Sequence, residues 1–174
     1  MSKIPILYTL GLNSNTEDNK HIIMLDFDID DISTVKDEIK NAIEKFKLSS
    51  FYIIKSTHGF NAFCLDKVNL NCLFLILNDF ENIDKDFIFM TGKRGYATIR
   101  IGKDKKYIMK IESNYNDTIK SKPHKNALKY YYDITINDTI NFDNYKIASL
   151  CQYENKKYGQ KLPYNNIQLK KYIR

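Results

Sequence analysis

The chain has 174 residues, of which 43% are apolar and 28% are charged, a composition typical of one ordinary globular domain. No two of its three cysteines form a Cys-x-x-Cys pair, so neither a disulfide framework nor a zinc knuckle is indicated. The longest apolar run covers residues 72–77, which is too short to cross a bilayer, and the first residues lack the pattern of a secretory signal. We therefore expect an intracellular, cytoplasmic protein that has no membrane partner.

The net charge of +6 is distributed unevenly along the chain. Residues 1–92 contain 9 Lys and Arg against 14 Asp and Glu, whereas residues 93–174 contain 18 against 7. An acidic half that binds metal beside a basic half that binds phosphate would suit a nucleic-acid partner. The alternative is that the lysines only keep the protein soluble.

The first predicted elements are buried strands and an amphipathic helix. A short strand over residues 4–10 and a polar loop lead to an apolar strand over residues 21–27, which we expect to be buried on both faces. Thr34 and Asp37 form a capping box, which predicts that a helix begins there. The apolar face of this helix comprises Val35, Ile39, Ala42, Ile43 and Phe46.

The next elements alternate between strands and helices. Strands over residues 51–55 and 60–65 are joined by a short turn, and the leucine-rich segment 68–77 predicts a largely buried helix. Three further strands are expected over residues 87–90, 96–101 and 107–111. The last predicted elements are a helix over residues 123–132, with Pro123 in its first turn, and a strand over residues 145–152.

The first hundred residues thus follow the order β-α-β-β-α-β, which is shared by ferredoxin-like, split-βαβ proteins and by RNA-recognition modules (RRMs). We therefore expect an α+β fold, with an RRM-like, ferredoxin-like antiparallel sheet and helices packed on one face. A single domain is expected over residues 1–155, followed by a basic tail over residues 156–174. The candidate nucleic-acid-binding residues of this tail are Lys156, Lys157, Lys161, Lys170 and Lys171.

Two carboxylates mark the end of the apolar strand over residues 21–27. Alternate residues of a strand share a face, so Asp26 and Asp28 are expected to project side by side. Two like charges at this spacing repel unless a cation lies between them, and a hard divalent ion with oxygen ligands suits that arrangement. The strand end therefore predicts a site for Mg²⁺ or Mn²⁺. The alternative is that both are surface carboxylates.

The hairpin over residues 55–62 is the second candidate for binding chemistry. Its small hydroxyl residues and its glycine would let backbone N–H groups approach a triphosphate closely. The alternative is an ordinary β-hairpin turn, in which Gly59 takes a positive φ and Ser56 forms a local hydrogen bond.

Together these segments resemble the archaeo-eukaryotic primase–polymerase superfamily. Its members have an apolar strand that ends in Asp-x-Asp, then a helix, a Ser-x-x-Gly-x-His hairpin and a further Asp. Asp26 and Asp28 match the first motif, and Ser56 and Gly59 match the second. Asn61 stands where the family has its histidine, and an asparagine can donate a hydrogen bond to phosphate but cannot carry charge.

The resemblance implies a metal-dependent polymerase site. Asp26, Asp28 and a third acid would hold two divalent ions, Mg²⁺ or Mn²⁺, which clamp the triphosphate and activate the primer 3′-hydroxyl. The third acid is expected to be Asp86, with Asp84 as the alternative. The nucleotide-binding residues that it implies are Ser56, His58, Gly59, Asn61, Lys93, Arg94, Arg100 and Lys103. The alternative for the basic strand is a solvent-facing edge that lysines protect from aggregation.

We therefore expect a DNA primase or polymerase type of nucleotidyltransferase. Its partners would be a nucleoside triphosphate, single-stranded or primer–template DNA, and a helicase or another replication protein of a plasmid or virus. The first alternative is a non-catalytic nucleic-acid-binding protein that retains the same fold, which Asn61 favours. The second is a regulatory or toxin-like protein that binds nucleotides but not DNA.

Overall fold

The computed structural model describes residues 8–101, 105–115, 119–132, 150–154 and 166–167. The strands are β1 (Tyr8–Asn13), β2 (His21–Phe27), β3 (Phe51–Lys55), β4 (Phe60–Val68), β5 (Thr98–Ile101), β6 (Lys106–Ile111), β7 (Leu150–Glu154) and β8 (Asn166–Ile167). The helices are α1 (Ile32–Phe46), α2 (Leu70–Leu77), α3 (Lys85–Arg94) and α4 (Lys122–Tyr132). The protein therefore has an α+β fold, as expected.

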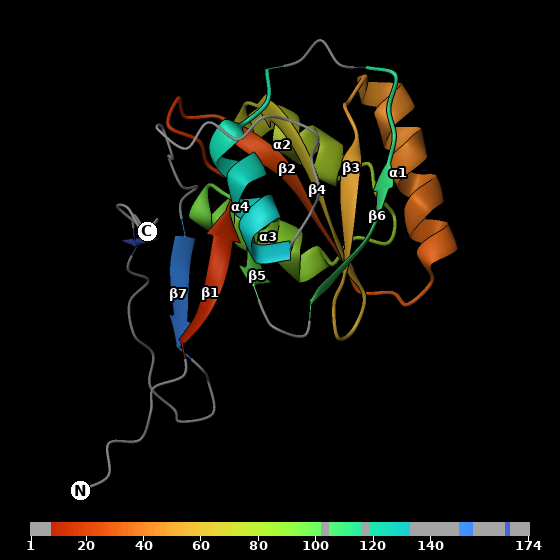
Figure 1. Cartoon of the computed structure of the whole chain (residues 1–174). Helices are drawn as coiled ribbons and strands as arrows, with labels where there is room; N and C mark the ends of the chain where they lie inside the picture. The colour runs from red at the N-terminus through yellow and green to blue at the C-terminus, as the bar shows by residue number, and fades with distance from the viewer. Residues whose placement is uncertain (1–7, 102–104, 116–118, 133–149, 155–165, 168–174) are drawn as a thin grey trace, which may run out of the picture.

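The described strands form two antiparallel sheets, in the orders β2-β4-β3-β6 and β5-β1-β7-β8 (Figure 1). In the first sheet β4 is antiparallel to both β2 and β3, so β2 and β3 run parallel, and β2-α1-β3 is the expected split βαβ unit. The fourth strand differs from the ferredoxin-like order, because β6 pairs with β3 rather than with β2. The strand that follows α3, β5, belongs to the second sheet.

The strand predicted over residues 87–90 is wrong, because this segment lies inside α3. Both ends of the helix are capped: the carboxylate of Asp84 accepts a hydrogen bond from the backbone N–H of Asp86, and Gly95 ends the helix with a φ of 78°. These caps satisfy the free backbone groups at the helix ends and outweigh the strand-like apolar run between them.

The capping box predicted at Thr34 and Asp37 is also wrong. Helix α1 is capped by Asp31, whose carboxylate accepts hydrogen bonds from the Ser33 backbone N–H at 3.0 Å and from the Thr34 hydroxyl at 2.6 Å. Thr34 thus donates to the cap residue instead of being the cap, because a carboxylate is the stronger acceptor. The helix cap consequently lies three residues earlier than expected.

Other element boundaries also moved. The predicted polar loop after residue 10 is too long, because β1 continues to Asn13. Residues 4–7 of the predicted first strand lie outside the described residues. Likewise β7 occupies the end of the last predicted strand, whose residues 145–149 lie outside the described part. The predicted tail contributes β8, which pairs with β7. Its five candidate lysines lie outside the described residues.

Helices cover both faces of the β2-β4-β3-β6 sheet, so the prediction that they pack on one face is wrong. Tyr132 of α4 packs against Phe63 with ring centroids 5.8 Å apart, while Phe27 of β2 meets Phe80, which follows α2, at 5.7 Å. These contacts lie on opposite faces, because Phe27 pairs with Phe60, three residues from Phe63. In Figure 1, α2 lies behind the sheet and α4 in front of it. A strand that is apolar at nearly every position requires such cover on both sides.

A buried histidine ties α4 to β1. The Nε2 of His124 lies 2.7 Å from the carbonyl oxygen of Asn13, and its Nδ1 lies 2.7 Å from the Ser121 hydroxyl oxygen. A carbonyl can only accept, so Nε2 carries the hydrogen. Burial lowers the pKa of His124 to about 4, so the imidazole is neutral near pH 7 and its Nδ1 accepts from the Ser121 hydroxyl.

Acidification is expected to destabilise the protein through His124. Its pKa is lower in the folded than in the unfolded chain, so the unfolded state takes up a proton as the pH falls through the window from 6.5 to about 4. The free energy of unfolding in urea should decrease by roughly 2 kcal/mol between about pH 7.5 and about pH 5. In His124→Gln this decrease should be much smaller. An equal decrease in both proteins would assign the effect to other groups.

Candidate functional site

A cavity of about 550 Å³ lies where β2 ends and β4 begins. Its walls come from both sheets, because β2 and β4 belong to one sheet and β5, which also contacts β2, belongs to the other. Helix α3 borders the cavity as well. Four acidic and three basic side chains line it, and these are Asp26, Asp28, Asp84, Asp86, Arg94, Arg100 and Lys105. Residues from five separate segments of the chain are thereby brought to one place.

The acidic side of the cavity is built on β2. Asp26 is the next-to-last residue of this buried strand, and Asp28 is exposed just beyond its end. The loop before α3 runs alongside, since Phe27 pairs with Ile83 and the backbone N–H of Asp84 donates to the carbonyl oxygen of Asp26 at 2.8 Å. Asp84 is therefore positioned by the backbone of β2, the strand that leads to Asp26 and Asp28.

The carboxylate of Asp26 is half-buried, and its pKa is raised. Burial is the largest cause, and the negative charges of Asp84 and Asp28 add to it. The positive charge of Lys105 and the hydrogen bond from Asn61 lower the pKa and oppose this shift. Neighbouring carboxylates that disfavour the ionisation of Asp26 in this way are a suitable environment for a cation.

Asn61 lies opposite Asp26 on the neighbouring strand and is only 2% exposed. Its Nδ2 donates to the Oδ1 of Asp26 at 2.8 Å, while its own Oδ1 accepts from the Nζ of Lys105 at 2.7 Å. The amide therefore links the acidic wall of the cavity to a lysine from the segment before β6. Our sequence analysis did not identify Lys105, because its approach to Asn61 depends on how β6 pairs with β3.

The hairpin between β3 and β4 closes one side of the cavity. Gly59 is buried, and a Cβ atom placed on it would lie 1.9 Å from the carbonyl oxygen of Phe27. The alternative interpretation of the hairpin gave Gly59 a positive φ, which is wrong, because the glycine is needed for this close approach instead. The backbone N–H of Ser56 donates to the Gly59 carbonyl at 3.0 Å, and both Ser56 and His58 line the cavity.

The remaining predicted residues fall into three groups. Arg94 and Arg100 line the cavity, as does Asp86, although Asp84 is the acid whose charge raises the pKa of Asp26. Lys93 lies elsewhere on α3, where its ammonium group sits over the ring of Phe89 at 5.7 Å. Lys103 lies outside the described residues.

The donor set of the cavity fits a divalent metal that is completed by a substrate. Within the described ranges no three His, Cys, Asp or Glu residues already converge as a metal-binding group. Mg²⁺ commonly uses one or two carboxylates and takes its other ligands from water and phosphate oxygens. Asp26, Asp28 and Asp84 are the residues that would hold such an ion, and their mutual repulsion is what a cation would relieve.

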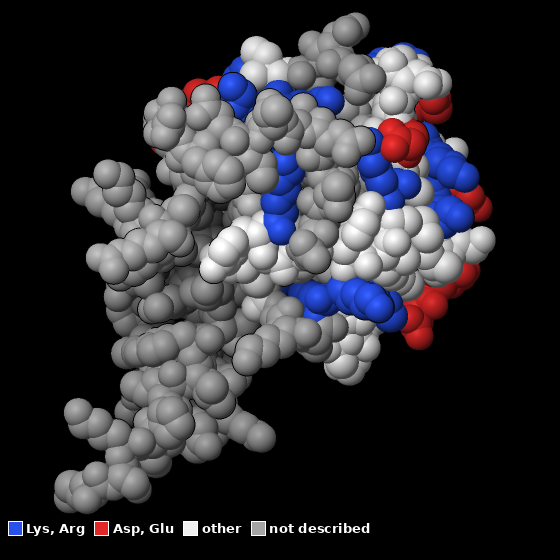
Figure 2. Space-filling view, viewed as in Figure 1, with Lys and Arg blue, Asp and Glu red and all other residues white. Residues whose placement is uncertain are grey.

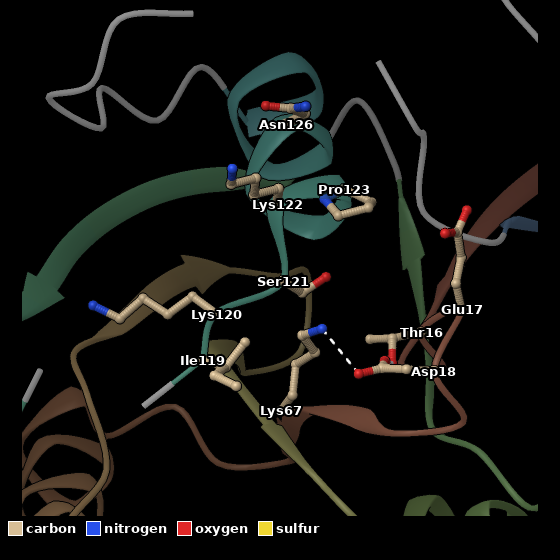
Figure 3. A pocket seen from close by; sticks show the side chains of 10 residues that line it. All are labelled: Thr16, Glu17, Asp18, Lys67, Ile119, Lys120, Ser121, Lys122, Pro123 and Asn126. Atoms are coloured by element: carbon tan, nitrogen blue, oxygen red, sulfur yellow. Dashed lines mark hydrogen bonds and ion pairs between the residues drawn. The ribbon is translucent and has the colours of Figure 1, made fainter. Parts of the chain in front are cut away.

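A second cavity, of about 420 Å³, lies at the opposite end of β4, beside the start of α4 (Figure 3). Figure 3 shows Lys67 and Asp18 facing each other across it, with their charged atoms 3.1 Å apart. Hydrogen bonds from Thr16 and Lys67 lower the pKa of Asp18 to about 2. Because this lysine already has an anionic partner, we assign no ligand to the second cavity.

No protein-family model matches the chain, and no curated protein or solved structure shows significant similarity to it. None of the helices in the described part of the chain combines the length and the apolar character needed to cross a bilayer. The chemistry of the first cavity is therefore the basis for assigning a function.

Proposed function

We propose that the protein is a primase/polymerase-like nucleotidyltransferase that binds a nucleoside triphosphate with Mg²⁺ or Mn²⁺ in the cavity at the end of β2. One observation carries this proposal: acidic and basic residues from distant segments line one cavity. Asp26, Asp28 and Asp84 form one set, and Arg94, Arg100 and Lys105 the other. Carboxylates that can hold a metal beside cations that can hold phosphates are what phosphoryl transfer requires. The volume is within the range of small-molecule sites.

Each group of lining residues has a separate task in this proposal. A divalent ion on the carboxylates would neutralise phosphate charge and favour attack by a primer hydroxyl. Arg94 and Arg100 would neutralise and orient the phosphates, and Asn61 would orient Asp26 through its hydrogen bond. The apolar side chains of Phe87 and Met90 would exclude water from one wall.

The surface charge supports a nucleic-acid partner, as primer–template or single strand. Figure 2 shows basic side chains over α4 and near β6, on the same face of the molecule. The pKa of Lys125 in α4 is lowered by burial and by the charges of Lys129, Lys120 and Lys122, so these positive groups lie close together. Such clusters are favourable positions for a phosphate backbone.

A second candidate function is non-catalytic nucleic-acid binding. The contacts of Asn61 favour it, because Asp26 already receives a hydrogen bond from this amide and lies near the charge of Lys105. A cavity whose acids are compensated by the protein itself can be stable without an ion.

Calorimetric titration with Mn²⁺ and a deoxynucleoside triphosphate tests the proposed function. The wild type should bind the pair with a dissociation constant on the order of 1 μM to 1 mM, and Asp26→Ala/Asp28→Ala should not bind it. Asp37→Ala, which removes an exposed carboxylate of α1, is the matched control and should bind like the wild type. DNA binding without any metal or triphosphate binding would instead establish the non-catalytic function.

A further inference from the structure

The orientation of the Asn61 amide is determined by its two partners. An ionised carboxylate can only accept hydrogen bonds, and an ammonium group can only donate them. The Nδ2 of Asn61 must therefore face Asp26, and its Oδ1 must face Lys105. A buried amide in this position can hold one anion and one cation at the same time.

Lys105 supplies a positive charge beside the acidic wall. It is the largest electrostatic influence that favours ionisation of Asp26, against burial and against the charges of Asp84 and Asp28. An ammonium group is a compact charge on a flexible four-carbon chain, so it can exchange partners without moving the backbone. Its ammonium group, held by the Asn61 amide, places a positive charge beside the carboxylates that a metal ion would use.

We propose that Lys105 is the resident counter-cation of the carboxylates, that a divalent metal displaces it, and that the released ammonium group then binds the triphosphate. This inference rests on the proposed function and adds a coupling between its two ligands. A divalent ion on Asp26 attracts the carboxylate more strongly than one ammonium group does and repels Lys105. Incoming phosphate oxygens would offer Lys105 a new partner inside the same cavity, so metal and triphosphate should bind cooperatively.

The coupling predicts effects of opposite sign for Lys105→Met. Without its competitor, Mn²⁺ alone should bind about threefold more tightly than to the wild type. The triphosphate, titrated in saturating Mn²⁺, should bind about tenfold more weakly because a charge-assisted contact is lost. If Lys105 had only a structural role, its replacement would weaken the binding of both ligands. If Lys105 only bound phosphate, its replacement would leave the affinity for the metal alone unchanged.

The experiment measures both constants on the full chain. Free Mn²⁺ is determined by electron paramagnetic resonance, and calorimetry with a non-hydrolysable triphosphate analogue gives the second constant. Lys106→Met removes an exposed neighbouring lysine that does not line the cavity and is the matched control. Lys105→Arg retains the charge and should keep both affinities near those of the wild type. Urea unfolding of Lys105→Met itself shows whether any loss of binding in that variant is a loss of folding.

The outcomes separate this inference from the proposed function. Tighter Mn²⁺ binding together with weaker triphosphate binding in Lys105→Met supports the exchange. Parallel weakening of both, a change in the triphosphate alone, or no change in either would overturn the exchange and leave the proposed function intact. If the wild type binds neither ligand, the proposed function itself is wrong, and the inference fails with it.

Discussion

Asp26→Asn is expected to abolish metal-dependent nucleotidyl transfer and at the same time to stabilise the metal-free protein. Loss of a carboxylate that holds the metal should lower the rate by about 10³-fold or more. The folded chain should gain about 1 kcal/mol, because the neutral amide avoids the burial of charge and the repulsion from Asp84 and Asp28. Primer extension measures the first effect, and thermal unfolding, with a rise of ~3 °C, measures the second.

The pH dependence of this gain follows from the raised pKa of Asp26. The folded state binds the proton more tightly than the unfolded state, so the wild type loses stability as the pH rises above the unfolded value of 3.8 and through the folded pKa. The advantage of Asp26→Asn should thus be present at pH 7 and shrink near pH 4. Asp37→Asn, on an exposed face of α1, should change neither property. A destabilised Asp26→Asn at pH 7 would show that the hydrogen bond from Asn61 and the attraction of Lys105 dominate.

Gly59→Ala is expected to cause the largest loss of stability among single small substitutions near the cavity. The added Cβ would lie 1.9 Å from the Phe27 carbonyl oxygen and 3.2 Å from that of Ile29, both backbone atoms. Neither can retreat without separating the β3–β4 hairpin from the end of β2. The cost should be about 3 kcal/mol or more, measured by urea unfolding, and nucleotide binding should fall with it because the hairpin closes the cavity.

Gly92→Ala is the matched control for this substitution. Gly92 is exposed within α3, and a Cβ there would lie 3.6 Å from the ring of Phe74, an ordinary contact. Alanine forms helices better than glycine, so this variant should be stabilised by about 0.5 kcal/mol. Equal behaviour of the two variants would refute the close approach at Gly59 as the reason for glycine there.

Local patterns predicted the elements whose signals are strong and unopposed. The strand over residues 21–27 is apolar almost throughout, and the helix with Val35 and Ile39 on one face has clear periodicity. The same patterns failed where an apolar run has two interpretations. Phe87 and its neighbours fit a strand by composition, and the caps at Asp84 and Gly95 make them a helix. In a segment this short, the apolar pattern alone does not distinguish a helix from a strand. The caps at its two ends together decide for the helix.

The residues of the candidate site likewise divide into those that the sequence could identify and those that it could not. Asp26, Asp28, Ser56 and Asn61 were identifiable because they lie next to each other along two short segments, and the cavity includes all four. Lys105 could not be identified from the sequence, because nothing in its local sequence distinguishes it from the other lysines. Its role depends on the pairing of β6 with β3, which was expected from neither spacing nor composition.

The amino-acid sequence by itself determined the chemistry available to this protein: an acidic strand end, a glycine hairpin and an excess of lysine in the second half. Tertiary structure alone decided which of these groups meet. It turned the Asn61 amide between an acid and a lysine, brought Asp84 against the backbone of Asp26, and placed Lys93 away from the cavity. The physical reason is that strand register, which sets these positions, arises from contacts between residues far apart in the chain.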